Sequence, residues 1–310
     1  MKVAARRILR AIGLLLSVIA ILWIATRFAR GGAFDLLEQG SISKGRLVTV
    51  LAALAVAYAA AAVLLALAWW RLIAALATDH AVPVAQTMAA YAVSQYGKYL
   101  PGNVAHYAIR HAWIRRYGIP HASLGLASVL EAALLLLSAS ALTLLGDTRA
   151  LRALSIVDTR VALALLVAVL IGLGFALRAL RRGAFHDRFR LPPFPPMSVL
   201  LVCVACYCGF FVASAACLDG LAHALSIPAV SFAMLLAAGA ASWLAGFIVI
   251  GAPGGLGVRE ATFVALAGPA LGEDRALLLI GLFRIVTFLG DTLVLAAGTA
   301  VLRLQRKPAP

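Results

Sequence analysis

Two short stretches of an otherwise apolar sequence bring together a Pro-Gly pair, glycines and cations, and these residue types are suited to binding a phosphate group. The first reads YGKYLPGNVAHYAIR, residues 96–110, and the second reads GAPGGLGVRE, residues 251–260. Proline removes a hydrogen bond from a helix interior and glycine adopts unusual backbone angles, so each stretch predicts a break between two helical segments. A helix that starts at such a break offers free backbone N–H groups to an anion, and nearby lysine or arginine strengthens the site.

The first stretch places its cations on both sides of the predicted break. Lys98 lies just before the break, and Arg110 lies nine residues beyond Pro101. His106 precedes Arg110 by about one helical turn. Asn103 is in position to cap the second half-helix. The alternative interpretation is an interfacial loop whose cations reach lipid phosphates without any role in transport.

The second stretch repeats this arrangement. Its glycines allow the backbone to approach a ligand closely, and Arg259 falls in the first turn of the helix that follows. The sequence therefore predicts that the two breaks together bind an anionic head group. The residues predicted to contribute are Lys98, Tyr99, Pro101, Gly102, Asn103, His106, Arg110, Pro253, Gly254, Gly255, Gly257, Arg259 and Glu260.

Three more charged residues lie in apolar runs and are candidates for ion pairs or for coupling transport to protons: Glu131, Arg284 and Asp291. A charge at the centre of a bilayer costs at least about 2.5–3.5 kcal/mol, so such residues usually face a partner or a cavity. Arg284 and Asp291 share one helix face but lie about 10 Å apart along it, too far to pair directly. We expect Arg284 to pair with Glu131 or Glu260, and Asp291 to pair with Arg259.

The motifs of metal, cofactor and catalytic sites are missing from the sequence. Cys203 and Cys206 have the spacing of a metal or redox pair, but all four cysteines fall in one apolar run, which favours a role in helix packing. No H-E-x-x-H spacing, G-x-S-x-G elbow or Walker loop occurs. We therefore expect no metal, no cofactor and no catalytic residue, so the protein is not expected to be an enzyme.

The elements that must position these residues are membrane-spanning helices. Hydrophobic residues make up 64% of the sequence, whereas a soluble domain is roughly half apolar. Runs of about 20 apolar residues are long enough to cross the hydrocarbon core. The sequence predicts an all-α polytopic membrane protein with a single transmembrane domain over residues 1–310. The predicted full spans are Ile8–Thr26, Leu47–Trp70, His121–Leu145, Val161–Leu177, Val199–Leu218 and Ala276–Leu302.

Two further apolar segments, Val84–Tyr117 and Ala229–Ala267, contain the Pro-Gly breaks. We expect each to enter and leave the membrane on the same side as a re-entrant hairpin; if they cross as kinked helices, the chain has eight spans. Each segment follows one full span and precedes another, so residues 47–145 and 199–302 form the two units of an inverted repeat, joined by Val161–Leu177. Matched interruptions in two halves are typical of the substrate site of a transporter.

The formal charge of +15 fits topology signals and contacts with anionic lipids, and no basic soluble domain is present to bind nucleic acid. Clusters of Lys and Arg at residues 2–10, 178–190 and 303–307 predict that both termini lie in the cytoplasm, and the basic residues at 27–46 oppose this orientation. The run that starts at Ile8 exceeds the core of a signal peptide, which predicts an uncleaved first span.

Together, the two motifs resemble those of the lysylphosphatidylglycerol synthase transmembrane-region family, flippase-like proteins that include the flippase domain of multiple peptide resistance factor. The resemblance covers nearly the whole chain and implies lipid translocation. In the best-known members a soluble aminoacyl-transferase domain follows, and it is missing up to Pro310 here, so the head group is left open. The residues that carry the resemblance are Gly97, Lys98, Tyr99, Leu100, Pro101, Gly102 and Arg110, then Pro253, Gly254, Gly255, Leu256, Gly257, Arg259 and Glu260.

Three functions are compatible with the sequence. The first is a flippase or scramblase that moves a phosphate-bearing lipid, such as an aminoacylated phospholipid or a polyprenyl-phosphate-linked lipid, between leaflets of the bacterial cytoplasmic membrane. The second is a small-anion transporter, which a closed aqueous vestibule would favour. The third is a non-transporting membrane subunit of a lipid-modifying or glycosyl-transfer system. The expected partners are lipids with anionic head groups, and the alanine-rich spans are also compatible with a homo-oligomer.

Overall fold

The computed structural model describes residue 26 and residues 42–77, 82–100, 105–146, 192–227, 231–249 and 252–305. Within these ranges all regular secondary structure is helical. The α-helices are α3 (Lys44–Leu76), α4 (Val84–Ser94), α5 (Ala105–Ile114), α6 (His121–Leu145), α10 (Met197–Ala224), α11 (Phe232–Ile248), α12 (Val258–Leu271) and α13 (Glu273–Leu304). The 3-10 turns are η1 (Gln95–Tyr99), η2 (Arg115–Tyr117) and η3 (Pro253–Gly255).

Among the described residues, four helices are long and apolar enough to cross a membrane. These are α3, α6, α10 and α13, with 33, 25, 28 and 32 residues. They correspond to four of the six predicted spans. The other two, Ile8–Thr26 and Val161–Leu177, lie outside the described residues except for Thr26. Over the described residues, the prediction of an all-helical, multi-pass membrane protein is therefore confirmed, while the total number of spans stays a prediction.

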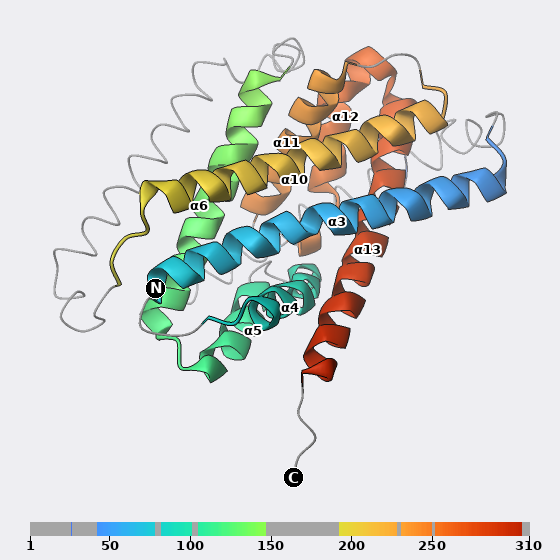
Figure 1. The fold of residues 1–310 in the computed structure, drawn as a ribbon. Coiled ribbons are helices and arrows are strands. Elements are labelled where there is room, and N and C mark those ends of the chain that lie inside the picture. Colours follow the sequence, from blue (N-terminus) through green and yellow to red (C-terminus); the bar gives the residue numbers. More distant parts are fainter. Residues whose placement is uncertain are drawn as a thin grey trace.

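Each Pro-Gly motif lies between two short helices. α4 has 11 residues and α5 has 10, so at 1.5 Å per residue each measures about 15–17 Å, against a hydrocarbon core of roughly 30 Å. α11 has 17 residues and α12 has 14. The members of each pair pack against one another as a helical hairpin, and α4 and α5 are seen side by side in Figure 1. The helices on either side of each motif are thus separate elements.

Two long helices, α3 and α10, lie side by side and run in opposite directions (Figure 1). The sulfur of Cys203 lies 3.4 Å from the carbonyl oxygen of Ala68, and the sulfur of Cys217 lies 3.8 Å from that of Leu54. The later cysteine on α10 contacts the earlier residue on α3, which is the pattern of two antiparallel helices. The small thiol side chains let the two helices approach closely, as the packing interpretation of the cysteines expects.

The described helices form two sets, α3–α6 and α10–α13, and helices of one set pack against helices of the other. α4 packs against α13, and α11 packs against α6. Likewise α3 packs against α13, and α10 packs against α6. Where α4 meets α13 the backbones are very close, since a Cβ on Gly298 would lie 2.7 Å from that of Ala92. Each hairpin therefore rests on the closing helix of the other set.

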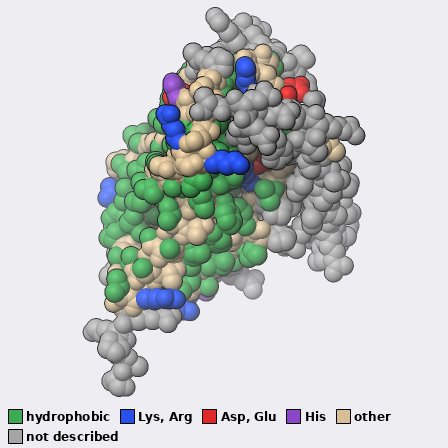
Figure 2. All heavy atoms as spheres, turned by 90° about the vertical axis from the view of Figure 1, so that its right-hand side faces the viewer, with side chains coloured by type: hydrophobic (Ala, Val, Ile, Leu, Met, Phe, Trp, Pro, Cys, Tyr) green, Lys and Arg blue, Asp and Glu red, His purple; other side chains and the backbone are tan. Residues whose placement is uncertain are grey.

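The surface has the character of a membrane protein. On the face shown in Figure 2, hydrophobic side chains cover a broad middle zone, and most Lys and Arg side chains lie above or below it. Large apolar side chains are exposed on several helices, including Leu201 at 61% and Phe288 at 50%. Apolar surface of this extent is suited to contact with lipid rather than water.

Candidate functional site

The tips of the two hairpins meet inside the bundle. η1, which extends the first helix of one hairpin, contacts η3 at the tip of the other. A Cβ on Gly254 would lie only 2.9 Å from a carbon of the Tyr99 ring. Gly254 also has a φ of 58°, in the left-handed region that favours glycine. Because Gly254 has no side chain, the Tyr99 ring of the opposing hairpin can lie close to its backbone.

α12 begins just after the second motif, as the sequence predicts, with Arg259 in its first turn. The backbone N–H of Gly257 donates a hydrogen bond of 2.7 Å to Oε2 of Glu260. A carboxylate in the first turn satisfies a free N–H group and interacts favourably with the positive end of the helix dipole. Glu260 therefore occupies part of the helix start where a ligand anion was expected.

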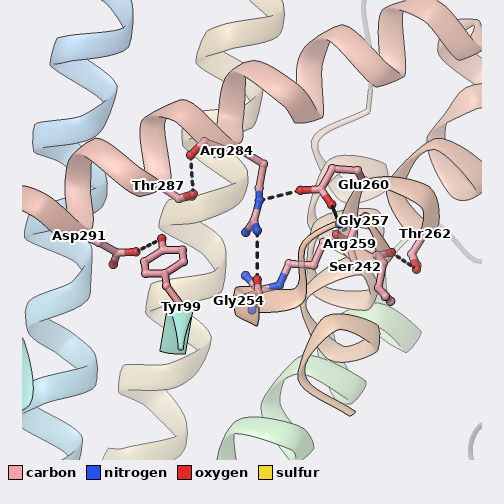
Figure 3. Close-up of polar contacts among 11 residues, drawn as sticks. Tyr99, Ser242, Gly254, Gly257, Arg259, Glu260, Thr262, Arg284, Thr287 and Asp291 are labelled. Atoms are coloured by element: carbon pink, nitrogen blue, oxygen red, sulfur yellow. Dashed lines mark hydrogen bonds and ion pairs between the residues drawn. The ribbon is translucent and has the colours of Figure 1, made fainter. Parts of the chain in front are cut away.

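Arg284 reaches from α13 to the tip of the second hairpin (Figure 3). Its Nε lies 2.6 Å from Oε1 of Glu260, and its Nη2 donates a hydrogen bond of 3.0 Å to the carbonyl oxygen of Gly254. The sequence left Arg284 to pair with either Glu131 or Glu260, and the structure selects Glu260. This ion pair fixes the start of α12 against α13.

Asp291 lies about two turns further along α13 and contacts the first hairpin. Its Oδ2 lies 2.7 Å from Nζ of Lys98 and accepts a hydrogen bond of 2.6 Å from the Tyr99 hydroxyl. The expected pairing of Asp291 with Arg259 is wrong, because Lys98 and Tyr99 already surround the carboxylate. α13 thus contacts both hairpins, one through Arg284 and the other through Asp291.

Arg259 differs from the other cations at this site because the described residues place no carboxylate within ion-pair distance of its guanidinium. Its Nε is buried and has no hydrogen-bond partner within the described ranges. The guanidinium carbon lies 5.8 Å from the ring centre of Trp243. Gly246 and Gly255 make room for the side chain, since a Cβ on either would lie 2.5 or 2.6 Å from its atoms. A guanidinium that is partly removed from water and lacks a counter-ion attracts an anion.

We refer to the six residues Lys98, Tyr99, Arg259, Glu260, Arg284 and Asp291 as the central cluster. It holds three cations and two carboxylates. Lys98 is matched by Asp291, and Arg284 is matched by Glu260. One positive charge is left over, on Arg259.

A small cavity adjoins the central cluster. Arg259 and Arg284 line it together with the polar side chains of Ser214, Thr287 and Tyr58. Its volume is about 40 Å³, which is room for about three water molecules at roughly 10–15 Å³ each. A lipid head group does not fit in this space.

The central cluster combines residues from both Pro-Gly motifs. A family match that supports this site must therefore cover both motifs. The family model described as the lysylphosphatidylglycerol synthase TM region matches residues 10–294. The chain belongs to this family. None of the curated proteins compared with the chain matches it. The resemblance based on the paired motifs is thereby confirmed, and the match to this flippase-like membrane domain includes both hairpins and the whole central cluster.

A second charged pair of this lysylphosphatidylglycerol synthase-type domain lies apart from the central cluster. Nη1 of Arg110 lies 2.5 Å from Oε2 of Glu131, and the two side chains are only 1% and 2% exposed. The guanidinium also lies over the ring of Tyr91 at 3.8 Å and that of Trp69 at 4.6 Å. Arg110 was predicted to bind the head group, but here its charge is matched and its faces are covered. In this state it joins α5 to α6.

The structure describes only some of the remaining predicted site residues. His106 is buried beside Tyr107, with ring centres 3.9 Å apart, and its Nδ1 has no partner among the described residues. Residues 101–103, including the predicted helix cap, lie outside the described ranges, as does the side chain of Pro253. The predicted contribution of these residues to ligand binding stays a prediction.

Three residues outside the predicted site, Tyr96, Thr292 and Phe288, complete the contact between the first hairpin and α13 in this family member. The hydroxyls of Tyr96 and Thr292 are hydrogen-bonded. The rings of Tyr96, Tyr99 and Phe288 also pack edge to face or tilted, with centres 5.7–6.0 Å apart. The signal that could have found Tyr96 and Thr292 is the spacing: Tyr96 precedes Tyr99 by one helical turn, and Thr292 adjoins Asp291.

Proposed function

We propose that this chain is a lipid translocase, which moves a phosphate-bearing lipid between the leaflets of the cytoplasmic membrane and catalyses no chemical reaction. Membership of a flippase-like family supports the general activity. The observation that carries the choice of a phosphate is Arg259, a half-buried arginine whose Nε is buried without a hydrogen-bond partner and whose guanidinium has no counter-ion among the described residues. A phosphate supplies the missing charge and matches the planar donor arrangement of arginine.

The two carboxylates of the central cluster act in this proposal as counter-ions that are exchanged for the ligand. A phosphate held by Arg259 competes with Asp291 for Lys98, whose side chain is 19% exposed and thus accessible. When the lipid leaves, Asp291 pairs with Lys98 again. The cation is never left without a partner at low dielectric, which keeps the loaded and empty states close in free energy.

The small cavity beside Arg259 means that a head group enters only after the hairpin tips separate at the contact between Tyr99 and Gly254. We propose that α4 and α5 enter and leave on the cytoplasmic side, and that α11 and α12 enter and leave on the outer side. The exchanged packing of α4 on α13 and of α11 on α6 supports residues 47–145 and 199–302 as an inverted repeat. Opening toward one side and then the other would move the site between leaflets.

Reconstitution into liposomes tests the proposal. Purified protein is placed in vesicles that contain phosphatidylglycerol or a polyprenyl phosphate labelled with a fluorophore, and leaflet exchange is followed by quenching the label from outside. We expect exchange well above that of protein-free vesicles, and we expect Arg259→Ala to return it to the protein-free level. Wild-type exchange no faster than that of empty vesicles would overturn the proposal.

A matched control separates a specific role of Arg259 from a general effect of charge. Arg303 is an exposed arginine near the end of α13, so Arg303→Ala removes the same charge outside the central cluster. Equal loss of exchange in both variants would contradict the assignment of the head-group site. Equal elution volumes in size-exclusion chromatography show that both variants are folded.

A further inference from the structure

A second and larger hollow lies on the side of the bundle between α3, α4 and α13. Its volume is about 670 Å³, within the roughly 300–1,000 Å³ that is typical of small-molecule sites. Its lining residues are apolar, many of them alanine or valine, and Tyr91 is the one described lining residue whose side chain carries a polar group. We refer to it as the lateral groove.

The lateral groove is open on one side. Val56 and Val63 of α3 are 59% and 50% exposed, and Leu293 of α13 is 43% exposed. All three line the groove. In a membrane-spanning bundle, such an opening faces hydrocarbon rather than water, so the chemistry of an occupant is that of an alkyl or prenyl chain.

The groove leads to the central cluster along α13. Val301, Gly298 and Val294 line the groove, and their spacing of three and four residues places them on one face of the helix. Three residues before Val294, the same face carries Asp291, which pairs with Lys98. The apolar stripe therefore ends at a carboxylate of the central cluster.

The wall formed by α4 leads to the same place. Ala85, Met88 and Ala92 line the groove, and the next residue of this stripe, four positions on, is Tyr96. Tyr96 is hydrogen-bonded to Thr292 beside Asp291. Both walls of the groove thus run from a lipid-facing opening to the polar end that holds Lys98.

We propose that the lateral groove binds one hydrocarbon tail of the lipid whose head group is bound by the central cluster. This inference rests on the proposed function and adds the position of the tail. The occupant is argued from continuity: the groove is apolar, opens to the membrane and ends beside the cations that would bind a phosphate. Small side chains along its walls leave space for a flexible chain and impose little shape selection, so the head group decides which lipid is bound.

Photo-crosslinking tests this placement. The protein is reconstituted in phosphatidylethanolamine vesicles with phosphatidylglycerol that carries a diazirine in one acyl chain, and labelled peptides are identified by mass spectrometry. We expect labels to concentrate in residues 56–66, 85–92 and 293–301. We also expect several-fold less labelling there with a diacylglycerol probe of the same tail, because it lacks the phosphate. Equal labelling by the two probes would show ordinary bilayer lipid in the groove and overturn the inference.

Two neighbouring alanines of α13 provide a matched pair of variants. Ala297 is exposed and lines the groove, whereas Ala296 is exposed and is not part of its lining. Ala297→Phe should cause a several-fold loss of groove labelling and of leaflet exchange, and Ala296→Phe should leave both near wild type. Equal behaviour of the two variants would contradict the tail site.

The two proposals fail in distinguishable ways. Leaflet exchange that depends on Arg259 without labelling in the groove would refute the tail site alone and would indicate that another occupant, such as a segment of this chain, fills the groove. Labelling in the groove without any leaflet exchange would refute the translocase and leave a lipid-binding site.

Discussion

Arg110 and Glu131 form an ion pair that is almost completely removed from solvent, with both side chains at most 2% exposed. Replacing Arg110 by methionine leaves the Glu131 carboxylate buried without its partner. We expect Arg110→Met to lower the free energy of unfolding by about 3–5 kcal/mol, the usual cost of breaking such a pair. The measurement is denaturant or thermal unfolding in detergent micelles.

The double variant Arg110→Met with Glu131→Leu is the control for this first prediction. It removes both charges and should recover most of the stability lost in the single variant, since replacing a whole buried pair by apolar residues is often nearly neutral. Wild-type stability of the single variant would show that the pair contributes little. Burial of the Arg110–Glu131 pair would then not serve the stability of the fold.

Asp291 allows a second prediction at the residue scale. Asp291→Asn removes the negative charge that pairs with Lys98, so an anionic ligand no longer competes with a carboxylate. We expect glycerol phosphate, a soluble head-group analogue, to bind up to about tenfold more tightly, or roughly 1.4 kcal/mol, when titrated calorimetrically. Asp219→Asn, which removes a carboxylate on α10 that contacts His223, should leave this affinity unchanged. Weaker binding by Asp291→Asn would contradict the counter-ion role.

Single residues show where sequence reasoning succeeded and where it stopped. The charges were identifiable because they interrupt apolar runs, and the position of Arg259 at the start of α12 followed from the glycine-rich break before it. The partners were not identifiable, because Asp291 is about equally available to several cations until the packing of η1 on α13 is known. Helix spacing gives the face of a charge, but not the neighbouring helix to which it points.

At the scale of elements, the first hairpin closes around Gly97. A Cβ at this position would lie 2.6 Å from the backbone nitrogen of His106, and backbone cannot move aside without separating α5 from η1. We expect Gly97→Ala to destabilise the protein by about 1–3 kcal/mol. Thermal unfolding in detergent measures the loss, and loss of contact between the hairpin tips should also lower leaflet exchange.

Gly125 in α6 is the control for this prediction, because a Cβ there meets nothing within 4 Å. Gly125→Ala should be neutral or stabilising by up to about 1 kcal/mol, since alanine is the better helix former. If the two variants have the same stability, the close approach within the hairpin is not required for folding.

The elements themselves were largely predictable from the sequence. The first broken segment was expected to begin at Val84 and α4 does begin there, and α6 has the predicted bounds of His121 and Leu145. The lengths of the apolar runs and the positions of the helix-breaking Pro-Gly pairs determine such boundaries. The pairing of α4 with α13, and of α11 with α6, was not predictable because it depends on small-residue contacts between helices far apart in the chain.

The sidedness of the whole molecule leads to a further prediction. Single cysteines are introduced at or just beyond the two ends of each hairpin, at Val84 and Arg116 for the first and at Phe232 and Arg275, in the first turn of α13, for the second. All four positions are exposed. With a membrane-impermeant maleimide, we expect the first pair to react only from the cytoplasmic side and the second pair only from outside. The unmodified chain, whose native cysteines are buried or partly buried, gives the background. Reaction of the two ends of one hairpin from opposite sides would show a kinked span instead.

The crossed attachment of the hairpins determines which parts of the molecule can swing as rigid blocks. If residues 199–302 tilted as a unit, α4 would be pulled away from α13, where Gly298 allows the two backbones to come close together. If α13 travels with α4 and α5, and α6 travels with α11 and α12, these interfaces are kept, and the movement is taken up between α12 and α13, where Arg284 pairs with Glu260. Distances measured by spin labels across the α4–α13 interface should therefore stay constant while those between the hairpin tips change.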